Sequence, residues 1–148
     1  MIDQANIEEF KTNLCGQLIQ PGDEDYDEAC KIYNAMIERR PGLIARCADV
    51  ADVMAAVNIA REKDLLVAIR GGGHNGPGLG TCDDGLVIDM SAIKYTRVDP
   101  QASTVQVGGG CTWGDVDHAT HAFGLATPSG IVSTTGVGGL TLGGGHGY

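Results

Sequence analysis

Basic side chains are scarce in this sequence of 148 residues. Ten Lys and Arg are set against nineteen Asp and Glu, which gives a formal net charge of -9 at pH 7. Nucleic-acid binding draws much of its affinity from Lys and Arg contacts to phosphates across a basic surface. The charge balance therefore argues against a nucleic acid as a partner.

Long apolar runs are also lacking. No stretch approaches the roughly 20 apolar residues that a membrane-spanning helix needs. The first ten residues, MIDQANIEEF, contain neither the basic nor the apolar segment of a secretory signal. With 43% hydrophobic and 20% charged residues, we expect one globular, cytoplasmic domain without a membrane partner.

Cysteine pairs with the spacing of a metal site or redox centre are absent. The five cysteines are scattered along the chain: Cys15, Cys30, Cys47, Cys82 and Cys111. Their odd number and the lack of any C-x-x-C pair favour reduced thiols. We expect no disulfide and no metal.

Glycine is abundant, and its distribution is uneven. Of the 23 glycines, only Gly16, Gly22 and Gly42 precede residue 70, and the remainder form tight clusters. A glycine lets the backbone approach another group closely, because it has no Cβ. The second half of the chain is therefore expected to bring its backbone against a ligand.

The first half predicts a βαβ unit. A helix is expected over 25–39, followed by strand 43–47, a helix that Asp49 caps, and a buried strand over 65–69. The apolar face of the capped helix is predicted from a spacing of 3.6 residues as Val50, Val53, Met54, Val57 and Ala60.

A different pattern follows. Residues 86–90 predict an apolar strand, and 95–99 with 104–107 predict a hairpin. A helix over 112–123 is expected to begin with a capping box of Thr112 and Asp115. Its predicted core face consists of Trp113, Val116, Ala119, Thr120 and Phe123. The glycine-rich residues from 124 onward contain no recognisable helix or strand, and we expect the chain to be a fragment.

The loop of residues 71–76, Gly-Gly-Gly-His-Asn-Gly, directly follows a predicted strand. Consecutive glycines let several backbone N–H groups point toward one anion, as a pyrophosphate site requires. The loop also satisfies G-x-G-x-x-G, and Asp89 lies where a ribose-binding acid would be sought. A dinucleotide fold needs a helix at this point, however, and 77–85 predict only loop. A Walker loop is excluded because the sequence contains no Gly-Lys pair.

Four ordered segments together carry a family resemblance. They are RGGGHN at 70–75, GLVIDMS at 85–91, VQVGGGCTWGDVD at 105–117 and GLATPSGIVSTTGVGGLTLGGGHG at 124–147. In this order and spacing they resemble the PCMH-type FAD-binding domain of the berberine-bridge-type branch of the vanillyl-alcohol-oxidase superfamily. The similarity covers about residues 21–148, after an N-terminal extension of residues 1–20.

The resemblance implies an α+β domain of two lobes with FAD between them. A βαβ lobe would cover about 21–85, and a mainly antiparallel lobe, incomplete at its C-terminus, would begin near 86. The loop Gly71, Gly72, Gly73, His74, Asn75 and Gly76 would wrap the pyrophosphate. His74 would be joined covalently to the 8α carbon of the flavin, and the alternative is a histidine that only caps the loop by hydrogen bonding.

A second loop is implied to lie against the cofactor. Its residues are Ser133, Thr134, Thr135, Gly136, Gly138 and Gly139. Bicovalent members of the family have a cysteine where this chain has Val132, so a single flavin link is expected. Thr135 matches a position that governs oxygen access and favours an oxidase. Arg70 would add positive charge near the phosphates, or else form a structural ion pair.

Other candidate residues carry weaker indications. His118 and His121 form H-x-x-H on a predicted helix, but no third metal ligand has a recognisable spacing, so a solvated helix face is favoured. His146 has no assigned role. Cys111 and Trp113 are expected to be buried packing residues.

The resemblance implies the front part of an FAD-linked oxidoreductase, whose full-length form would transfer a hydride from a small organic substrate to the flavin. The substrate lobe and the catalytic base would lie beyond this chain, so no catalytic residue is assigned. Two alternatives stay open: a non-catalytic module whose apolar edges are covered by homo-oligomerisation, and a nucleotide-binding domain without redox chemistry.

Overall fold

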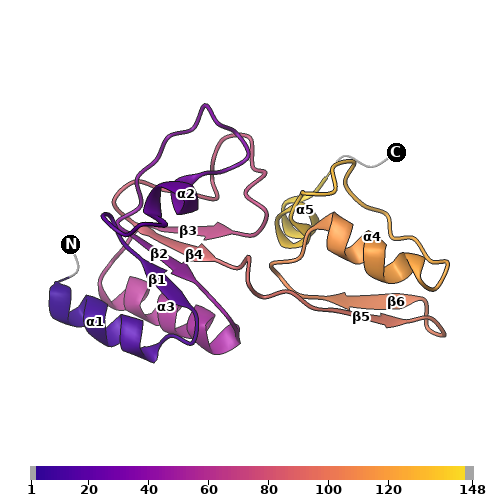
Figure 1. Cartoon of the computed structure of the whole chain (residues 1–148), viewed down its shortest axis with the longest axis horizontal. Coiled ribbons are helices and arrows are strands. Elements are labelled where there is room, and N and C mark those ends of the chain that lie inside the picture. Colours follow the sequence, from indigo (N-terminus) through magenta and orange to yellow (C-terminus); the bar gives the residue numbers. More distant parts are fainter. Residues whose placement is uncertain (1–2, 146–148) are drawn as a thin grey trace.

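The structure, a computed structural model, describes residues 3–145. It consists of two lobes, with a mixed sheet and its helices in the first and a hairpin with two helices in the second (Figure 1). The chain passes once from the first lobe to the second, after residue 89. No helix in this part of the chain is long and apolar enough to span a membrane.

The sheet of the first lobe has the strand order β1-β2-β4-β3. Its strands are β1 (Gln17–Ile19), β2 (Leu43–Arg46), β3 (Val67–Arg70) and β4 (Leu86–Asp89). The strands β2, β4 and β3 are parallel, and β1 is antiparallel to β2. The predicted βαβ unit is confirmed as two parallel strands, but β4 lies between them. Strand β4 is buried along its whole length, as its continuous apolar sequence predicts.

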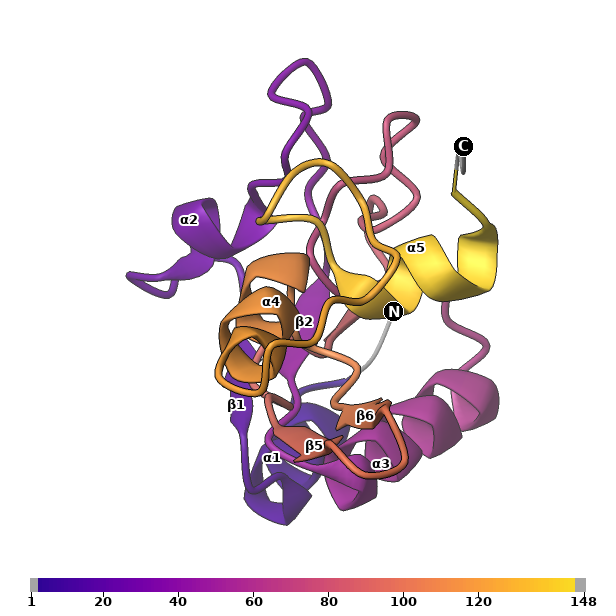
Figure 2. The ribbon, with the colours of Figure 1, turned by 90° about the vertical axis from the view of Figure 1, so that its right-hand side faces the viewer.

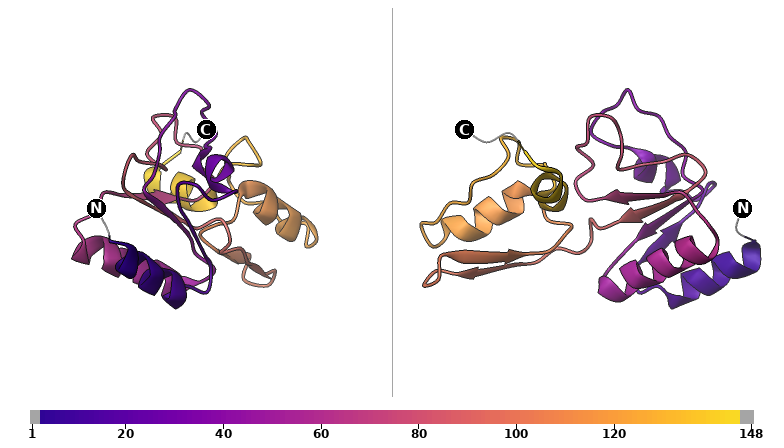
Figure 3. Two further views of the ribbon diagram at one scale, coloured as in Figure 1. Left: turned by 60° about the vertical axis from the view of Figure 1, so that its left-hand side comes forward. Right: turned by 180° about the vertical axis from the view of Figure 1, so that it is seen from behind.

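Helices cover both faces of this sheet (Figure 3). The helices α1 (Gln4–Asn13) and α3 (Val50–Glu62) lie on one face, and the short helix α2 (Tyr26–Cys30) lies on the other. Alternating strand residues supply the two cores, with Ala45 and Ile88 toward α1 and α3, and Ile44 and Val87 toward α2.

The predicted apolar face of α3 is correct at Val53 and Ala60, which pack in the core, but wrong at Val50, Met54 and Val57. Asp49 caps this helix as predicted, through the N–H of Asp52 at 3.1 Å. Val50 and Met54 are exposed, at 67% and 61%, whereas Asp52 and Ala56 are buried. The buried Asp52 carboxylate accepts three backbone N–H groups near α1 and β2, and these contacts turn a polar residue toward the core.

The helix predicted over 25–39 is also wrong, because only Tyr26–Cys30 are helical. Residues 31–40 instead form an irregular loop. In it, the Tyr33 N–H donates to the carbonyl of Gly73 at 3.1 Å, and the Asn34 amide donates to the carbonyl of Gly76 at 2.8 Å. These contacts to a distant glycine loop override the local helical pattern.

The second lobe contains the predicted hairpin, formed by β5 (Thr96–Asp99) and β6 (Thr104–Val107). The helix α4 (Trp113–His121) packs above it, as Figure 2 shows end-on. The Thr112 N–H donates to the Asp115 carboxylate at 2.8 Å, which confirms the capping interaction. Phe123 lies beyond the helix and is exposed, contrary to the prediction. The glycine-rich tail forms an additional helix, α5 (Val137–Gly143), which was not predicted.

The boundaries between the parts differ from the predicted ones. Residues 4–19 form α1 and β1, which belong to the sheet and core of the first lobe. Strand β4 pairs with both β2 and β3 in the same sheet. The passage between the lobes therefore follows Asp89 and does not lie near residue 85, because a central strand cannot be separated from its neighbours.

Candidate functional site

A cleft of about 580 Å³ lies where the two lobes meet. The first lobe contributes the end of β3 and all of the predicted residues Arg70, Gly71, Gly72, Gly73, His74, Asn75 and Gly76. The second lobe contributes Thr135, Gly136 and Gly139 and then the end of α5. The predicted Ser133, Thr134 and Gly138 do not line the cleft. Ser133 and Thr134 lie in the loop just before Thr135, and Gly138 lies in the first turn of α5.

The two glycine loops touch each other through their backbones. A Cβ added to Gly72 would lie 2.3 Å from the nitrogen of Gly136, and one added to Gly136 would lie 2.2 Å from the nitrogen of Gly72. Any side chain at either position would force the loops apart. Gly73 adopts a φ of +69°, a left-handed conformation that also favours glycine. The glycines are thus required for the cleft to form.

Backbone hydrogen bonds anchor the second loop to the start of α4. The Trp113 N–H donates to the Thr135 carbonyl at 3.0 Å, and the Gly114 N–H donates to the Ser133 carbonyl at 2.8 Å. On the other side, the Val137 N–H donates to the carbonyl of Cys111 at 2.9 Å. The position of the second loop is therefore set by the buried N-terminal turn of α4.

His74 connects the two loops through its side chain. Its Nε2 lies 2.9 Å from the Thr134 hydroxyl, and its Nδ1 lies 3.3 Å from the Thr135 hydroxyl. Both contacts reach more than fifty residues along the chain, which places His74 at the junction of the predicted cofactor loops. Partial burial lowers the pKa of His74 below its ordinary value of 6.5. The imidazole is therefore held mainly neutral at pH 7.

Tyr33 stacks on the His74 ring, with ring centroids 3.9 Å apart and planes inclined by 19°. Sequence reasoning missed this residue, because it lies in a segment that was predicted to be helical. The only local sign that this segment is not helical is Asn34, a poor helix former that follows Tyr33. A contact between residues 41 positions apart could not be inferred from either feature.

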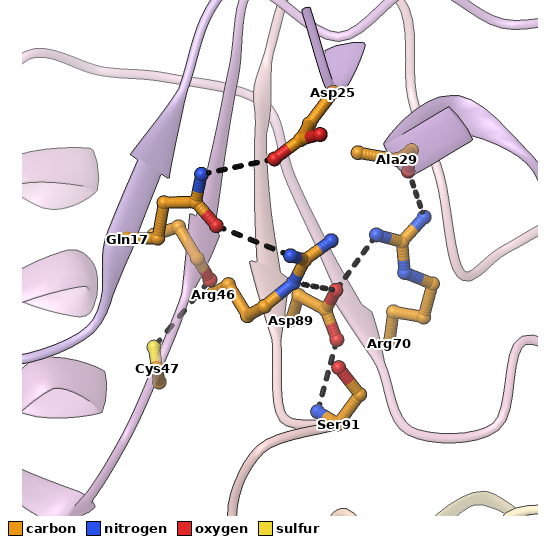
Figure 4. A network of polar contacts seen from close by, with 9 residues as sticks. Gln17, Asp25, Ala29, Arg46, Cys47, Arg70, Asp89 and Ser91 are labelled. Atoms are coloured by element: carbon orange, nitrogen blue, oxygen red, sulfur yellow. Dashed lines mark hydrogen bonds and ion pairs between the residues drawn. The ribbon is translucent and has the colours of Figure 1, made fainter. Parts of the chain in front are cut away.

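Arg70 belongs to a polar network that centres on the buried Asp89 carboxylate (Figure 4). Its guanidinium is 2.9 Å from the Asp89 carboxylate and donates to the Ala29 carbonyl at 2.7 Å. Arg46 lies 3.7 Å from the same carboxylate, and the Ser91 N–H donates to it at 2.9 Å. Of the two interpretations of Arg70, the structural ion pair is therefore the one present.

The network supports the end of β3, immediately before the first glycine loop. Burial would raise the pKa of Asp89, but the Arg70 guanidinium and the Ser91 N–H hold it below its usual range. The carboxylate is thus a charged partner of buried Arg70. Asp89 is the last residue of β4, and its position, which invited comparison with a ribose-binding acid, is explained by its pairing with Arg70.

The weaker candidates lie away from the cleft. His118 and His121 are exposed on α4, and residues 3–145 contain no group of three or more His, Cys, Asp or Glu side chains that could hold a metal ion. Cys111 is buried, with its thiol 3.3 Å from the carbonyl of Tyr95. Trp113 is a core residue, as expected. His146 lies outside the described residues.

The cleft suits a nucleotide diphosphate held by the backbone. Its volume falls within the range of about 300–1,000 Å³ that is typical of ligand pockets. Among the described residues that line it, Arg70 is the only Lys or Arg, and its guanidinium is already paired with Asp89. Phosphates would therefore be bound by backbone N–H groups of the glycine loop, which glycines leave free of Cβ atoms. The close contact of Gly72 with the backbone of Gly136 holds the two sides of the cleft together.

Comparison with known proteins agrees with this chemistry. A family model described as an FAD binding domain matches residues 41–148. An FAD-linked oxidoreductase of Dictyostelium discoideum is 42% identical over 143 residues, which are 96% of this chain and 31% of that protein. The (R)-6-hydroxynicotine oxidase of Paenarthrobacter nicotinovorans is 36% identical over 92% of this chain and 30% of that protein.

Solved structures extend the likeness to the fold. A crystal structure of 6-hydroxy-D-nicotine oxidase from Arthrobacter nicotinovorans superposes with a TM-score of 0.83 at 35% identity, over 86% of this chain and 28% of that one. The berberine-bridge-enzyme-like protein 1 of Physcomitrella patens gives 0.83 at 28% identity, over 92% and 30%. This chain spans about 30% of the length of the curated relatives above. It belongs to the FAD-binding domain family of the FAD-linked oxidoreductases, with members of the berberine-bridge type among its relatives.

Proposed function

We propose that the protein is the flavin-holding part of an oxidase-like FAD-linked oxidoreductase and that His74 forms a single covalent bond to the flavin. The observation that carries this proposal is the position of His74 at the junction of both glycine loops, within the cleft and in contact with Thr134 and Thr135. A histidine that served only to cap one loop would not need to reach the second lobe.

The state of the imidazole supports the covalent bond. A neutral imidazole has a lone pair on one ring nitrogen, and the lowered pKa of His74 favours this neutral form. The link would replace a C–H bond at the 8α carbon by a C–N bond, with the proton lost to solvent and two electrons left on the flavin ring, which dioxygen would remove. The bound flavin would also supply the ring system that accepts a hydride from substrate. The two threonine hydroxyls would orient the ring, since each faces one nitrogen and can donate to it or accept from it.

The family resemblance supports both a single flavin link and an oxidase. It matches Val132 to the position of the second flavin link in bicovalent relatives, so His74 would be the sole attachment point. Thr135 lines the cleft, and the family resemblance matches it to a position that governs oxygen access. Names of relatives include oxidases of a hydroxynicotine and of a xylooligosaccharide. We propose that the full-length protein oxidises a small organic substrate such as an alcohol, an amine or a sugar.

The experiment is an absorption spectrum of the purified protein before and after acid precipitation. We expect a yellow protein whose colour stays with the precipitate, because a covalent bond survives unfolding. The variant His74→Ala should release its flavin into the supernatant, whereas the matched variant His118→Ala should retain it, because His118 is exposed on α4.

Two results would contradict the proposal in different ways. Yellow protein that loses all its colour to the supernatant would retain FAD binding but refute the covalent link. Colourless protein that takes up no added FAD would refute cofactor binding by this chain. Binding of ADP without FAD would favour a nucleotide-binding domain that lacks redox chemistry.

A further inference from the structure

The loop of residues 31–38 contacts the first glycine loop but belongs to neither predicted cofactor loop. Three interactions join the two: the Tyr33 N–H to the Gly73 carbonyl at 3.1 Å, the Asn34 amide to the Gly76 carbonyl at 2.8 Å, and the stack of Tyr33 on His74. Two polar contacts thus flank the stack. The loop meets the glycine loop on both sides of His74.

The Tyr33 side chain has no evident structural role in a core. It is 65% exposed, and it belongs to neither hydrophobic cluster of the first lobe. Large aromatic side chains normally gain their stability from burial. Its one described aromatic contact is the His74 ring. The Tyr33 ring therefore packs against His74 and adds little to the hydrophobic core that stabilises the fold.

The contacts of His74 restrict its ring in complementary directions. The threonine hydroxyls meet the two nitrogens in the plane of the ring, whereas Tyr33 covers one ring face at 3.9 Å. Hydrogen bonds to the two nitrogens still allow the His74 ring to rotate about the line that joins them. Tyr33, stacked on one face of the ring, opposes this rotation. Tyr33 is not among the residues that line the cleft, while His74 is, so the stack leaves the cleft accessible.

We propose that Tyr33 is a positioning residue that holds the His74 imidazole in the orientation required for flavin attachment. This inference rests on the proposed covalent role of His74. Tyr33 takes no part in the bond itself. Tyr33 restricts the orientations that the His74 ring can adopt before its nitrogen meets the 8α carbon of the flavin. A fixed geometry of this kind raises the rate of a reaction between two bound groups.

The variants Tyr33→Phe and Tyr33→Ala separate the stack from the hydroxyl. Phenylalanine keeps the aromatic face, and alanine removes it. Tyr95→Ala is the matched control, because Tyr95 is 46% exposed and lies near the hairpin of the second lobe. A third variant, Tyr33→Leu, retains apolar bulk without a planar ring, in case the alanine variant is poorly folded.

Two measurements are made on each variant, produced under riboflavin starvation so that it is purified without flavin. The first is the rate at which added FAD becomes acid-stable, relative to the total FAD bound. The second is the NMR chemical shift of the His74 ring protons, assigned by comparison with His74→Ala. An aromatic ring stacked at 3.9 Å shields these protons, so their signals report the stack whether or not flavin is present.

We expect Tyr33→Ala and Tyr33→Leu to bind FAD but to attach it roughly two- to tenfold more slowly, a range that corresponds to the strength of one aromatic pair. Their His74 signals should move downfield. Tyr33→Phe and Tyr95→Ala should match the unmodified protein in both measurements. Rescue by phenylalanine distinguishes positioning by the ring from hydrogen bonding by the tyrosine hydroxyl.

Contradictory results separate the two proposals. Attachment by Tyr33→Ala at the unmodified rate would refute the positioning role while the covalent role of His74 stands. His74 signals that do not move in Tyr33→Ala would refute the stack itself. If the unmodified protein forms no acid-stable flavin, the proposed function fails and the role of Tyr33 in attachment fails with it.

Discussion

The Arg70–Asp89 pair carries opposite charges inside the protein, where the two side chains are only 8% and 4% exposed. From the sequence, Arg70 was open between a phosphate contact and a structural ion pair, and Asp89 belonged to a dinucleotide motif that the following loop argued against. The structure joins them as partners, since strands β3 and β4 place Arg70 opposite Asp89 in register. Strand pairing of this kind cannot be inferred from two positions that are nineteen residues apart.

We predict that Asp89→Asn destabilises the protein by about 3–5 kcal/mol, because it leaves the buried Arg70 guanidinium without its charged partner. Chemical denaturation with urea measures this free energy. The matched variant Asp117→Asn, at an exposed position on α4, should change it by less than about 0.5 kcal/mol. A loss below about 1 kcal/mol in Asp89→Asn would show that the pair does not stabilise the loop.

The same pair gives stability a defined pH dependence. The pKa of Asp89 is lowered on folding, so the unfolded state binds more protons in acid. Its contribution is fully present above the ordinary pKa of 3.8 and is lost as pH falls through the lower folded value. Consistent with this sign, Asp89→Asn should show a smaller loss of stability between pH 5 and pH 3 than the unmodified protein.

The pKa of His74 predicts a different dependence, on the rate of flavin attachment. The protonated imidazole has no free lone pair, so the rate should rise with pH through a midpoint below the ordinary value of 6.5 and then become constant. Formation of acid-stable flavin at fixed FAD concentration measures it. A rate that continues to rise well above pH 7 would mean that His74 is protonated at neutral pH.

At the scale of elements, the strands were easier to predict than the helix surfaces. Continuous apolar residues identify β4 as a central strand, and turn residues identify the β5–β6 hairpin. The apolar periodicity of α3 was misleading, because it did not include Asp52. A buried carboxylate depends on partners from other segments, here the N–H groups of Cys15 and Gly16 at 2.8 and 2.9 Å.

These partners make Asp52 a connection between α3 and the segment that joins α1 to β1. Burial would raise its pKa, but the backbone N–H groups of Ala48, Cys15 and Gly16 hold the pKa below its usual range. We predict that Asp52→Ala lowers the free energy of unfolding by about 3 kcal/mol, since it leaves buried N–H groups unpaired. Glu62→Ala, exposed on the same helix, is the control in urea denaturation. Equal effects of the two would contradict this role.

The two glycine loops allow a sharper comparison. Gly72→Ala should abolish or greatly weaken FAD binding, because its Cβ would lie 2.3 Å from the backbone nitrogen of Gly136. The control His118→Ala, at an exposed position on α4 away from the cleft, should bind FAD within about threefold of the unmodified protein. Titration of the flavin spectrum measures both affinities, and similar losses would contradict a requirement for contact between the loops.

At the scale of the whole molecule, the family resemblance implied two lobes with a cofactor site between them, but the boundary expected near residue 85 differs from the one in the structure. Strand β4 follows a long loop and then inserts between β2 and β3, so chain order alone does not reveal which lobe contains it. The N-terminal residues likewise join the first sheet through the short antiparallel strand β1. Both features depend on pairings between distant segments, which local periodicity does not record.

The cleft is the consequence of this arrangement. Its first wall comes from the end of β3, and its second from the tail that α4 anchors, so neither lobe forms it alone. The residues that resemble the family's cofactor loops were predicted from their order in the chain. The contact between the loops and the support from Tyr33 required the structure, because each joins parts of the chain more than forty residues apart.

Mass spectrometry of tryptic peptides tests the covalent role of His74 most directly. Cleavage after Arg70 and Lys94 releases residues 71–94, a peptide in which His74 is the only histidine. We predict that this peptide carries the added mass of FAD and that fragmentation places it on His74. Recovery of the same peptide wholly unmodified from yellow protein, with the flavin free or attached to another peptide, would contradict that role.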